Sequence, residues 1–262
     1  MKALILAAGF GTRLEQSLRR YHGQHQKELK DWVEGKPKGL VTIQGKPVVQ
    51  HQLEQLLEAG ITRQDIFIHT NALYYQHYLN WAASAGIPAD HVFNNLIYDN
   101  DHRIGAVGDL QYALQRIEKD DFIVLASDTL LLSETEQLFS LGKLIRQYQR
   151  DSTSRIVVYE GEKEKLSRYG LVQVDAENRI IGFEEKPQAP KSNLVNASVQ
   201  VYSQKMIEAI LNSPLEPRAE SGMLIAYLYP RFPIKVERAA RRIDIGTVED
   251  VLRENIGAEK SL

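Results

Sequence analysis

The first thirteen residues, Met1-Lys-Ala-Leu-Ile-Leu-Ala-Ala-Gly-Phe-Gly-Thr-Arg13, decide the fold. The apolar run 3–8 has the length of one buried parallel strand, and it breaks at Gly9. A strand that ends in a glycine-rich turn exposes backbone N–H groups at the carboxyl edge of a sheet. These backbone donors together with Arg13 indicate a polyphosphate-binding site.

The composition describes a globular chain with a core of its own. The 262 residues are 43% hydrophobic, which suits one α/β domain. A net charge of −2 argues against a non-specific nucleic-acid binder. The chain has no cysteine, which excludes disulfides and thiol catalysis and fits a cytoplasmic protein. The N-terminal apolar run is too short for a signal peptide or a membrane span, so we expect no membrane partner.

Strand and helix patterns alternate through the first half. After the glycine turn, strand-like segments lie at 66–69, 91–95 and 122–126, and helical patterns at 47–59, 71–85, 108–117 and 134–149. Such β-α repetition predicts a doubly wound, Rossmann-like α/β sheet whose ligands bind beyond the carboxyl ends of the strands. Residues 14–36 are rich in polar side chains and read as a loop or lid with one helical piece.

The second half has a different character. Strand-like segments at 155–159, 171–174, 179–184 and 195–202 follow one another with turn signals between them. They predict a mixed sheet, with an antiparallel elaboration packed on the parallel part. Thr247 is placed to cap a last short helix.

Two aspartates stand alone at the ends of predicted strands. Asp128 follows the run 122–126, and Asp244 lies in Arg242-Ile-Asp-Ile-Gly-Thr247. Each could be a turn or cap residue, but two together favour a shared Mg²⁺, which needs only one or two carboxylates when phosphate oxygens complete its shell. The neighbouring pair Arg241-Arg242 is interpreted as a solvated pair near a strand start.

Two lysines lie in motifs that restrict their direction. Pro37 stiffens the backbone beside Lys38, and beside a glycine turn this favours a phosphate contact over a solvated loop. Glu185 and Lys186 end another strand, where a carboxylate for hydroxyls beside an ammonium for phosphate suits a phosphorylated polyol. The plain alternative for this second motif is a surface ion pair.

The order of these motifs resembles the sugar-1-phosphate nucleotidyltransferases, or nucleotide-sugar pyrophosphorylases, from one end of the chain to the other. The glucose-1-phosphate thymidylyltransferases are similar in pattern. The motifs that carry the resemblance are Gly9-x-Gly-Thr-Arg13, Lys36-Pro-Lys38, Asp128, Tyr169-Gly170, Glu185-Lys186-Pro187, Asn196 and Asp244-Ile-Gly-Thr247.

The resemblance implies an enzyme that condenses a nucleoside triphosphate with a sugar 1-phosphate, releasing pyrophosphate with the help of Mg²⁺. It implies catalytic roles for Arg13, Lys38 and Lys186, and it makes Asp128 and Asp244 the metal ligands. The implied nucleotide-binding residues are Ala8, Gly9, Gly11, Thr12, Arg13 and Gly105. The implied sugar-phosphate residues are Tyr169, Gly170, Glu185, Lys186 and Asn196. On this basis residues 1–262 form one domain, with the nucleotide held by about 1–150 and the sugar and second metal ligand by about 151–262.

Several positions depart from the family pattern. Gly39 stands where thymidylyl enzymes tend to carry a base-contacting Gln, and Ser127 and Ser198 stand where Gly is often found. The base and the sugar therefore stay open. Cytidylyltransferases of phosphocholine or another phosphoalcohol share the glycine turn and the aspartates, and a non-catalytic nucleotide-sugar sensor is a second alternative. A dinucleotide-dependent oxidoreductase is disfavoured by Leu14, which replaces the third glycine of its fingerprint. Relatives often assemble, so a homo-oligomer is compatible with the pattern.

Overall fold

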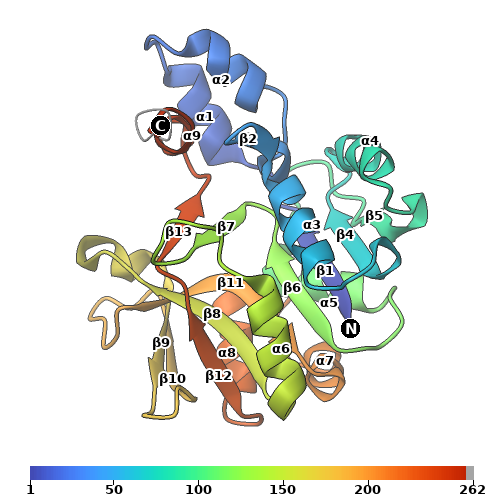
Figure 1. The fold of residues 1–262 in the computed structure, drawn as a ribbon, viewed down its shortest axis with the longest axis vertical. Helices are drawn as coiled ribbons and strands as arrows, with labels where there is room; N and C mark the ends of the chain where they lie inside the picture. Colours follow the sequence, from blue (N-terminus) through green and yellow to red (C-terminus); the bar gives the residue numbers. More distant parts are fainter. Residues whose placement is uncertain (258–262) are drawn as a thin grey trace.

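The computed structural model describes residues 1–257, and a parallel sheet forms its centre (Figure 1). Strand β1 (Lys2–Ala7) lies between β4 (Ile66–Thr70) and β6 (Phe122–Ala126), parallel to both. Strand β5 (Val92–Asn94) extends the parallel part beyond β4. Because these strands all run the same way, their carboxyl ends meet at one edge, where β1 passes into the glycine turn.

An antiparallel part continues the same sheet. Strand β11 (Leu194–Tyr202) pairs antiparallel with β6, and then with β9 (Gly170–Val174), which pairs with β10 (Ile180–Glu185). Strand β8 (Ser154–Glu160) also pairs with β11 and carries β12 (Ile234–Arg238) in parallel at its other side. The nine strands make one mixed sheet, which confirms the predicted fold class.

Helices cover both faces of this sheet. One face packs against α3 (Val48–Glu58), α4 (Tyr75–Ala85) and α6 (Leu141–Asp151). The other packs against α5 (Gly105–Leu114), α7 (Gln204–Leu211) and α8 (Ser221–Leu228). Strand β1 serves both cores, because Ile5 joins the first cluster and Leu4 the second, as period-two alternation requires.

A third, smaller core packs residues between 14 and 48 against the last described helix (Figure 1). It is built from α1 (Thr12–Arg20), α2 (Gln26–Val33), the hairpin β2 (Thr42–Ile43) with β3 (Lys46–Pro47), the pair β7 (Thr129–Leu132) with β13 (Arg241–Asp244), and α9 (Val248–Ile256). Leu14, Leu29 and Val33 are buried in it. The expected loop or lid at 14–36 is therefore wrong: two amphipathic helices lie there.

Other predicted elements differ in their bounds. The helix predicted over 134–149 begins only at Leu141, after Ser140, whose hydroxyl caps it by accepting from the Lys143 N–H. Helix α4 begins at Tyr75 rather than at 71, and α5 begins three residues earlier than predicted. Short 3-10 turns complete the chain at Lys38–Leu40, Arg63–Asp65, Ala89–His91 and Lys163–Arg168. Within residues 1–257, no helix is both long and apolar enough to cross a membrane.

Candidate active site

The glycine turn opens onto a cavity at the carboxyl edge of the sheet. Gly11 has φ 65°, in the left-handed region that glycine adopts without strain, and it precedes α1 with no side-chain cap on the first-turn N–H groups. The cavity has a volume of about 610 Å³. The implied nucleotide residues Ala8, Gly9, Gly11, Thr12, Arg13 and Gly105 all line it, together with Lys38.

Gly105 admits a close approach of two loops. It has φ 87°, and a Cβ there would come 2.5 Å from Cα of Arg218, in the segment before α8. The adjoining segment also reaches the cavity through Glu220. Residues from α5 and from the approach to α8 thus close one side of the space that the glycine turn opens.

Asp128 lies at this edge because the turn that carries it is clamped. The side-chain amide of Gln52, from α3, donates to the backbone oxygens of Ala126 and Thr129, each at 2.8 Å. Those two carbonyls bracket Ser127 and Asp128. Gln52 is 2% exposed, so the clamp is shielded from water. Strand pairing then brings the second aspartate close, because Asp244 in β13 lies opposite Thr129 in β7.

Three cations surround the two aspartates, and one of the three contacts both. Lys38 Nζ lies 3.0 Å from Asp128 Oδ2, and Arg13 lies 3.9 Å from Asp244 Oδ2. One guanidinium nitrogen of Arg242 lies 3.8 Å from Asp128 Oδ1 and 3.5 Å from Asp244 Oδ1. Three cations against two carboxylates leave an excess positive charge beside a cavity lined by free backbone donors. The arrangement suits a ligand that brings several negative charges.

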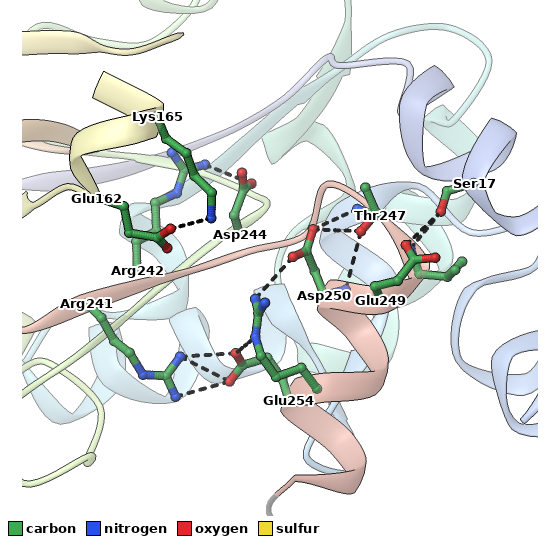
Figure 2. A network of polar contacts seen from close by, with 12 residues as sticks. Ser17, Glu162, Lys165, Arg241, Arg242, Asp244, Thr247, Glu249, Asp250 and Glu254 are labelled. Atoms are coloured by element: carbon green, nitrogen blue, oxygen red, sulfur yellow. Dashed lines mark hydrogen bonds and ion pairs between the residues drawn. The ribbon is translucent and has the colours of Figure 1, made fainter. Parts of the chain in front are cut away.

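Arg242 is the site residue that sequence reasoning missed. Its side chain is only 13% exposed, so the interpretation of Arg241-Arg242 as a solvated pair is wrong for this residue. A signal was available: residues two apart on a strand share a face, and Arg242 precedes Asp244 by two. Arg241 instead pairs with Glu254 (Figure 2) and with Glu136.

Neighbouring opposite charges favour the ionised forms of Asp128 and Arg242. Burial by itself raises the pKa of Asp128, but Lys38 and Arg242 outweigh burial, and the pKa lies below its usual range. Burial likewise disfavours the charged form of Arg242, and the carboxylates of Asp128 and Asp244 more than offset it, so its pKa is raised. Asp128 and Arg242 thus act as fixed charges at neutral pH rather than as sources of protons.

The implied sugar-phosphate residues lie along β9, β10 and β11. Gly170 pairs with Glu185 across β9 and β10, and a Cβ at Gly170 would come 2.9 Å from the Glu185 carboxylate. Burial raises the pKa of Glu185, although Lys186 acts against this. Lys186 pairs with Glu220, which lines the 610 Å³ cavity.

The other two implied sugar-phosphate residues, Asn196 and Tyr169, lie beside different cavities. Asn196 accepts hydrogen bonds from the Ser198 N–H at 3.2 Å and the Gln200 amide at 3.4 Å, and both partners line the cavity. Tyr169 instead lines a second cavity, of about 1220 Å³, on the far side of Asp244. Arg13 borders both cavities, so the charged cluster stands between them.

Paired charges hold the wall of the second cavity (Figure 2). Arg241 binds the buried Glu254 at 3.0 Å, and Lys165 binds Glu162 at 2.7 Å. Thr247 caps α9 as predicted and forms a capping box with Asp250. This network fixes β13 against α9, which fixes Asp244.

Asp128 and Asp244 can supply only part of the coordination shell of a divalent cation. Residues 1–257 contain no group of three or more acidic or histidine side chains arranged to hold a metal. Asp128 and Asp244 nevertheless reach the same guanidinium nitrogen, so they flank one point in space. Two carboxylates plus phosphate oxygens and water make a normal Mg²⁺ shell. The donor set therefore fits a metal that arrives with a phosphate ligand.

Comparison with known proteins defines the class. Residues 29–261 match the model of the nucleotidyl transferase family, and the chain belongs to this family. It is 28% identical over 216 residues to the catalytic subunit beta of mannose-1-phosphate guanylyltransferase from Drosophila pseudoobscura pseudoobscura, covering 81% of this chain and 51% of that protein. It is 26% identical to the UTP–glucose-1-phosphate uridylyltransferase AglF of Haloferax volcanii, covering 80% of this chain and 74% of that protein. The chain thus spans about half the length of the first relative.

Solved structures agree on the fold. A UTP-bound UGPase from Acinetobacter baumannii superposes with a TM-score of 0.68 at 21% identity, covering 100% of this chain and 94% of that chain. At this identity the likeness shows the fold alone, and the roles of individual residues depend on the geometry above.

Proposed function

We propose that this protein transfers a nucleotidyl group from a nucleoside triphosphate to a sugar 1-phosphate, giving a nucleoside-diphosphate sugar and pyrophosphate. The observation that carries the proposal is the cluster of Asp128, Asp244, Lys38, Arg13 and Arg242 beside the cavity under the glycine turn. The names of the relatives, which act on mannose 1-phosphate and glucose 1-phosphate, support a sugar-phosphate acceptor.

In this proposal the triphosphate lies over the glycine turn. Backbone N–H groups of Gly9 to Thr12 bind phosphate oxygens, since none of the first-turn donors of α1 is taken by a side-chain cap. Arg13 and Lys38 neutralise the phosphates from opposite ends of the cluster. Arg13 is 67% exposed and is free to turn toward an incoming ligand.

The reaction itself needs positioning and charge rather than an enzyme nucleophile. A sugar-phosphate oxygen forms a bond to the α-phosphorus while the bond from that phosphorus to the pyrophosphate oxygen breaks. Since a phosphate monoester is largely ionised at neutral pH, no general base is required. Lys38 and Arg242 hold the charge that develops on the equatorial oxygens in the transition state. Asp128 and Asp244 would hold Mg²⁺, which would supply Lewis-acid stabilisation at the α-phosphate.

The sugar phosphate is assigned to the second half of the chain, residues 151–262, and the nucleotide to residues 1–150, within one domain. Lys186 would exchange its ion pair with Glu220 for the acceptor phosphate. Glu185 would accept hydrogen bonds from sugar hydroxyls beside the backbone of Gly170 and the amide of Asn196. Tyr169 would bound the sugar from the side of the second cavity. Gly222 leaves room for the Glu185 carboxylate, because a Cβ at that position would overlap it.

Pyrophosphate release tests the proposal. The protein and Mg²⁺ are incubated with five nucleoside triphosphates against several sugar 1-phosphates and phosphocholine. We expect release in a sugar-phosphate row, and Lys186→Ala should weaken use of the acceptor more than binding of the triphosphate. Release with phosphocholine alone would favour a phosphoalcohol cytidylyltransferase. No release from a protein that binds nucleotide sugars would favour a sensor.

A further inference from the structure

Asp109 is a carboxylate that lines the 610 Å³ cavity but belongs to none of the groups assigned so far. It lies on α5, four residues after Gly105, and residues four apart on a helix share a face. An anion in a cavity proposed to hold a polyanion cannot face the phosphates. Such a group suits contact with the base of a nucleotide rather than with its phosphates.

Two buried donors fix the orientation of this carboxylate. Asp109 Oδ1 accepts from His69 Nε2 at 2.9 Å and from Asn95 Nδ2 at 2.8 Å. His69 is fully buried near the end of β4, and Asn95, just after β5, is 7% exposed. Because an ionised carboxylate only accepts, His69 carries its proton on Nε2. The other ring nitrogen, Nδ1, has no partner among the described residues.

The second oxygen, Oδ2, is left without a partner. No side chain or backbone group within 1–257 donates a hydrogen bond to it, and no lysine or arginine there pairs with Asp109. The side chain is 13% exposed, and it borders the cavity. The result is a rigid acceptor with one filled oxygen and one oxygen available to a ligand.

We propose that Asp109 selects the base of the nucleotide, and that it selects an amino-bearing base: guanine, adenine or cytosine. An exocyclic amino group gives Oδ2 an N–H donor, and guanine adds its ring N1–H on the same edge. Uracil and thymine offer only N3–H, which is flanked by two carbonyl oxygens that the carboxylate repels. The inference rests on the proposed function only in that the cavity holds a nucleoside triphosphate.

Asp109→Asn is the decisive variant because it replaces one carboxylate oxygen, which accepts hydrogen bonds, by an NH₂ group, which donates them. The amide oxygen can keep both bonds from His69 and Asn95, which leaves the NH₂ group on the cavity side. An acceptor becomes a donor with the fold retained. We expect wild-type protein to bind its preferred amino-bearing triphosphate at least about tenfold more tightly than UTP or dTTP. In the variant the ratio of these two affinities should fall by about 10- to 100-fold. The new NH₂ group and the amino group of the base are both donors, so neither finds an acceptor in the other.

Binding is measured by calorimetry with GTP, ATP, CTP, UTP and dTTP, without an acceptor. Asp90→Asn, an exposed change of the same chemistry outside the cavity, is the control and should keep the wild-type ratios. Equal affinity of the wild-type protein for all five triphosphates would overturn the inference. So would a ratio of affinities in Asp109→Asn that matches the ratio in Asp90→Asn. The predicted shift without pyrophosphate release from any acceptor would uphold it while refuting the proposed transferase.

Discussion

Replacing Arg242 by Met tests whether two aspartates and one guanidinium form a single electrostatic unit. The substitution keeps an unbranched stem and removes one positive charge that lies within 4 Å of both Asp128 and Asp244. In the ligand-free protein this charge opposes a divalent cation at the same two carboxylates. Its removal should therefore strengthen metal binding, although it should weaken turnover because the phosphates lose a cation.

The size of the effect follows from the spacing. Two unit charges about 4 Å apart interact by about 1 kcal/mol even in a water-like dielectric, so a divalent ion beside this mostly buried side chain feels at least about 2 kcal/mol. Since about 1.4 kcal/mol is a factor of ten, Mn²⁺ should bind Arg242→Met at least about 30-fold more tightly than wild type.

Titration of the nucleotide-free protein with Mn²⁺, followed by electron paramagnetic resonance, measures this directly. Arg241→Met is a matched control, because the neighbouring side chain faces Glu136 and Glu254 and should leave the Mn²⁺ affinity unchanged. Circular dichroism establishes that both variants are folded. Unchanged or weaker Mn²⁺ binding in Arg242→Met would refute the view that the charge of Arg242 opposes a metal at these two carboxylates.

Three further changes follow from the same geometry. Asp128→Asn should lower turnover by at least about 100-fold in steady-state assays, with near-wild-type circular dichroism, since it removes charge at the proposed metal position; a rate within threefold of wild type would exclude that role. Asp151 has its pKa lowered chiefly by its hydrogen bond from Arg155. Its contribution to stability is therefore complete above its unfolded-state pKa of about 4 and is lost as pH falls further. Urea unfolding at pH 6 and pH 3 should thus show a smaller decline for Asp151→Asn than for wild type, and equal declines would exclude this contribution. Thr247→Ala should cost about 1 kcal/mol of unfolding free energy by loss of the α9 cap, and an unchanged urea midpoint would argue against it.

Local patterns predicted the parallel half well. The apolar runs at β1 and β6, and the glycines that follow the helical patterns at 47–59 and 71–85, are signals contained within a few residues. The antiparallel strands were found for the same reason. The fold class therefore follows from the sequence, and the family comparison confirms it.

The missed elements depend on partners far along the chain. Thr129–Leu132 is a strand because it pairs with Arg241–Asp244, more than a hundred residues later. The chain then folds back on this strand, with the Phe139 N–H donating to the Leu131 carbonyl, so the helix predicted over 134–149 begins only at Leu141. In 14–36 the polar majority conceals Leu14, Leu29 and Val33, whose burial requires α9 from the other end of the chain. Neither partner is visible in a local window.

In the candidate site, too, some residues are marked by local sequence patterns and others are brought together only by the fold. Asp128, Asp244 and the glycine turn are marked by their places at strand ends. Arg242 looked like half of a solvated pair because its neighbour Arg241 carries the same charge, and only the strand alternation separates them. The orientation of Asp109 depends on donors from two other strands, which no spacing along the chain reveals.

The most direct test of the account is phosphorus NMR of a reaction containing Mg²⁺, the preferred triphosphate and a sugar 1-phosphate. The account predicts that wild-type protein converts the sugar-phosphate signal into a pair of coupled diphosphate signals, with one pyrophosphate formed for each. It also predicts that Asp244→Asn forms neither the sugar diphosphate nor pyrophosphate, although circular dichroism shows that the variant is folded. Pyrophosphate without a sugar diphosphate, or equal conversion by Asp244→Asn, would contradict nucleotidyl transfer at this cluster.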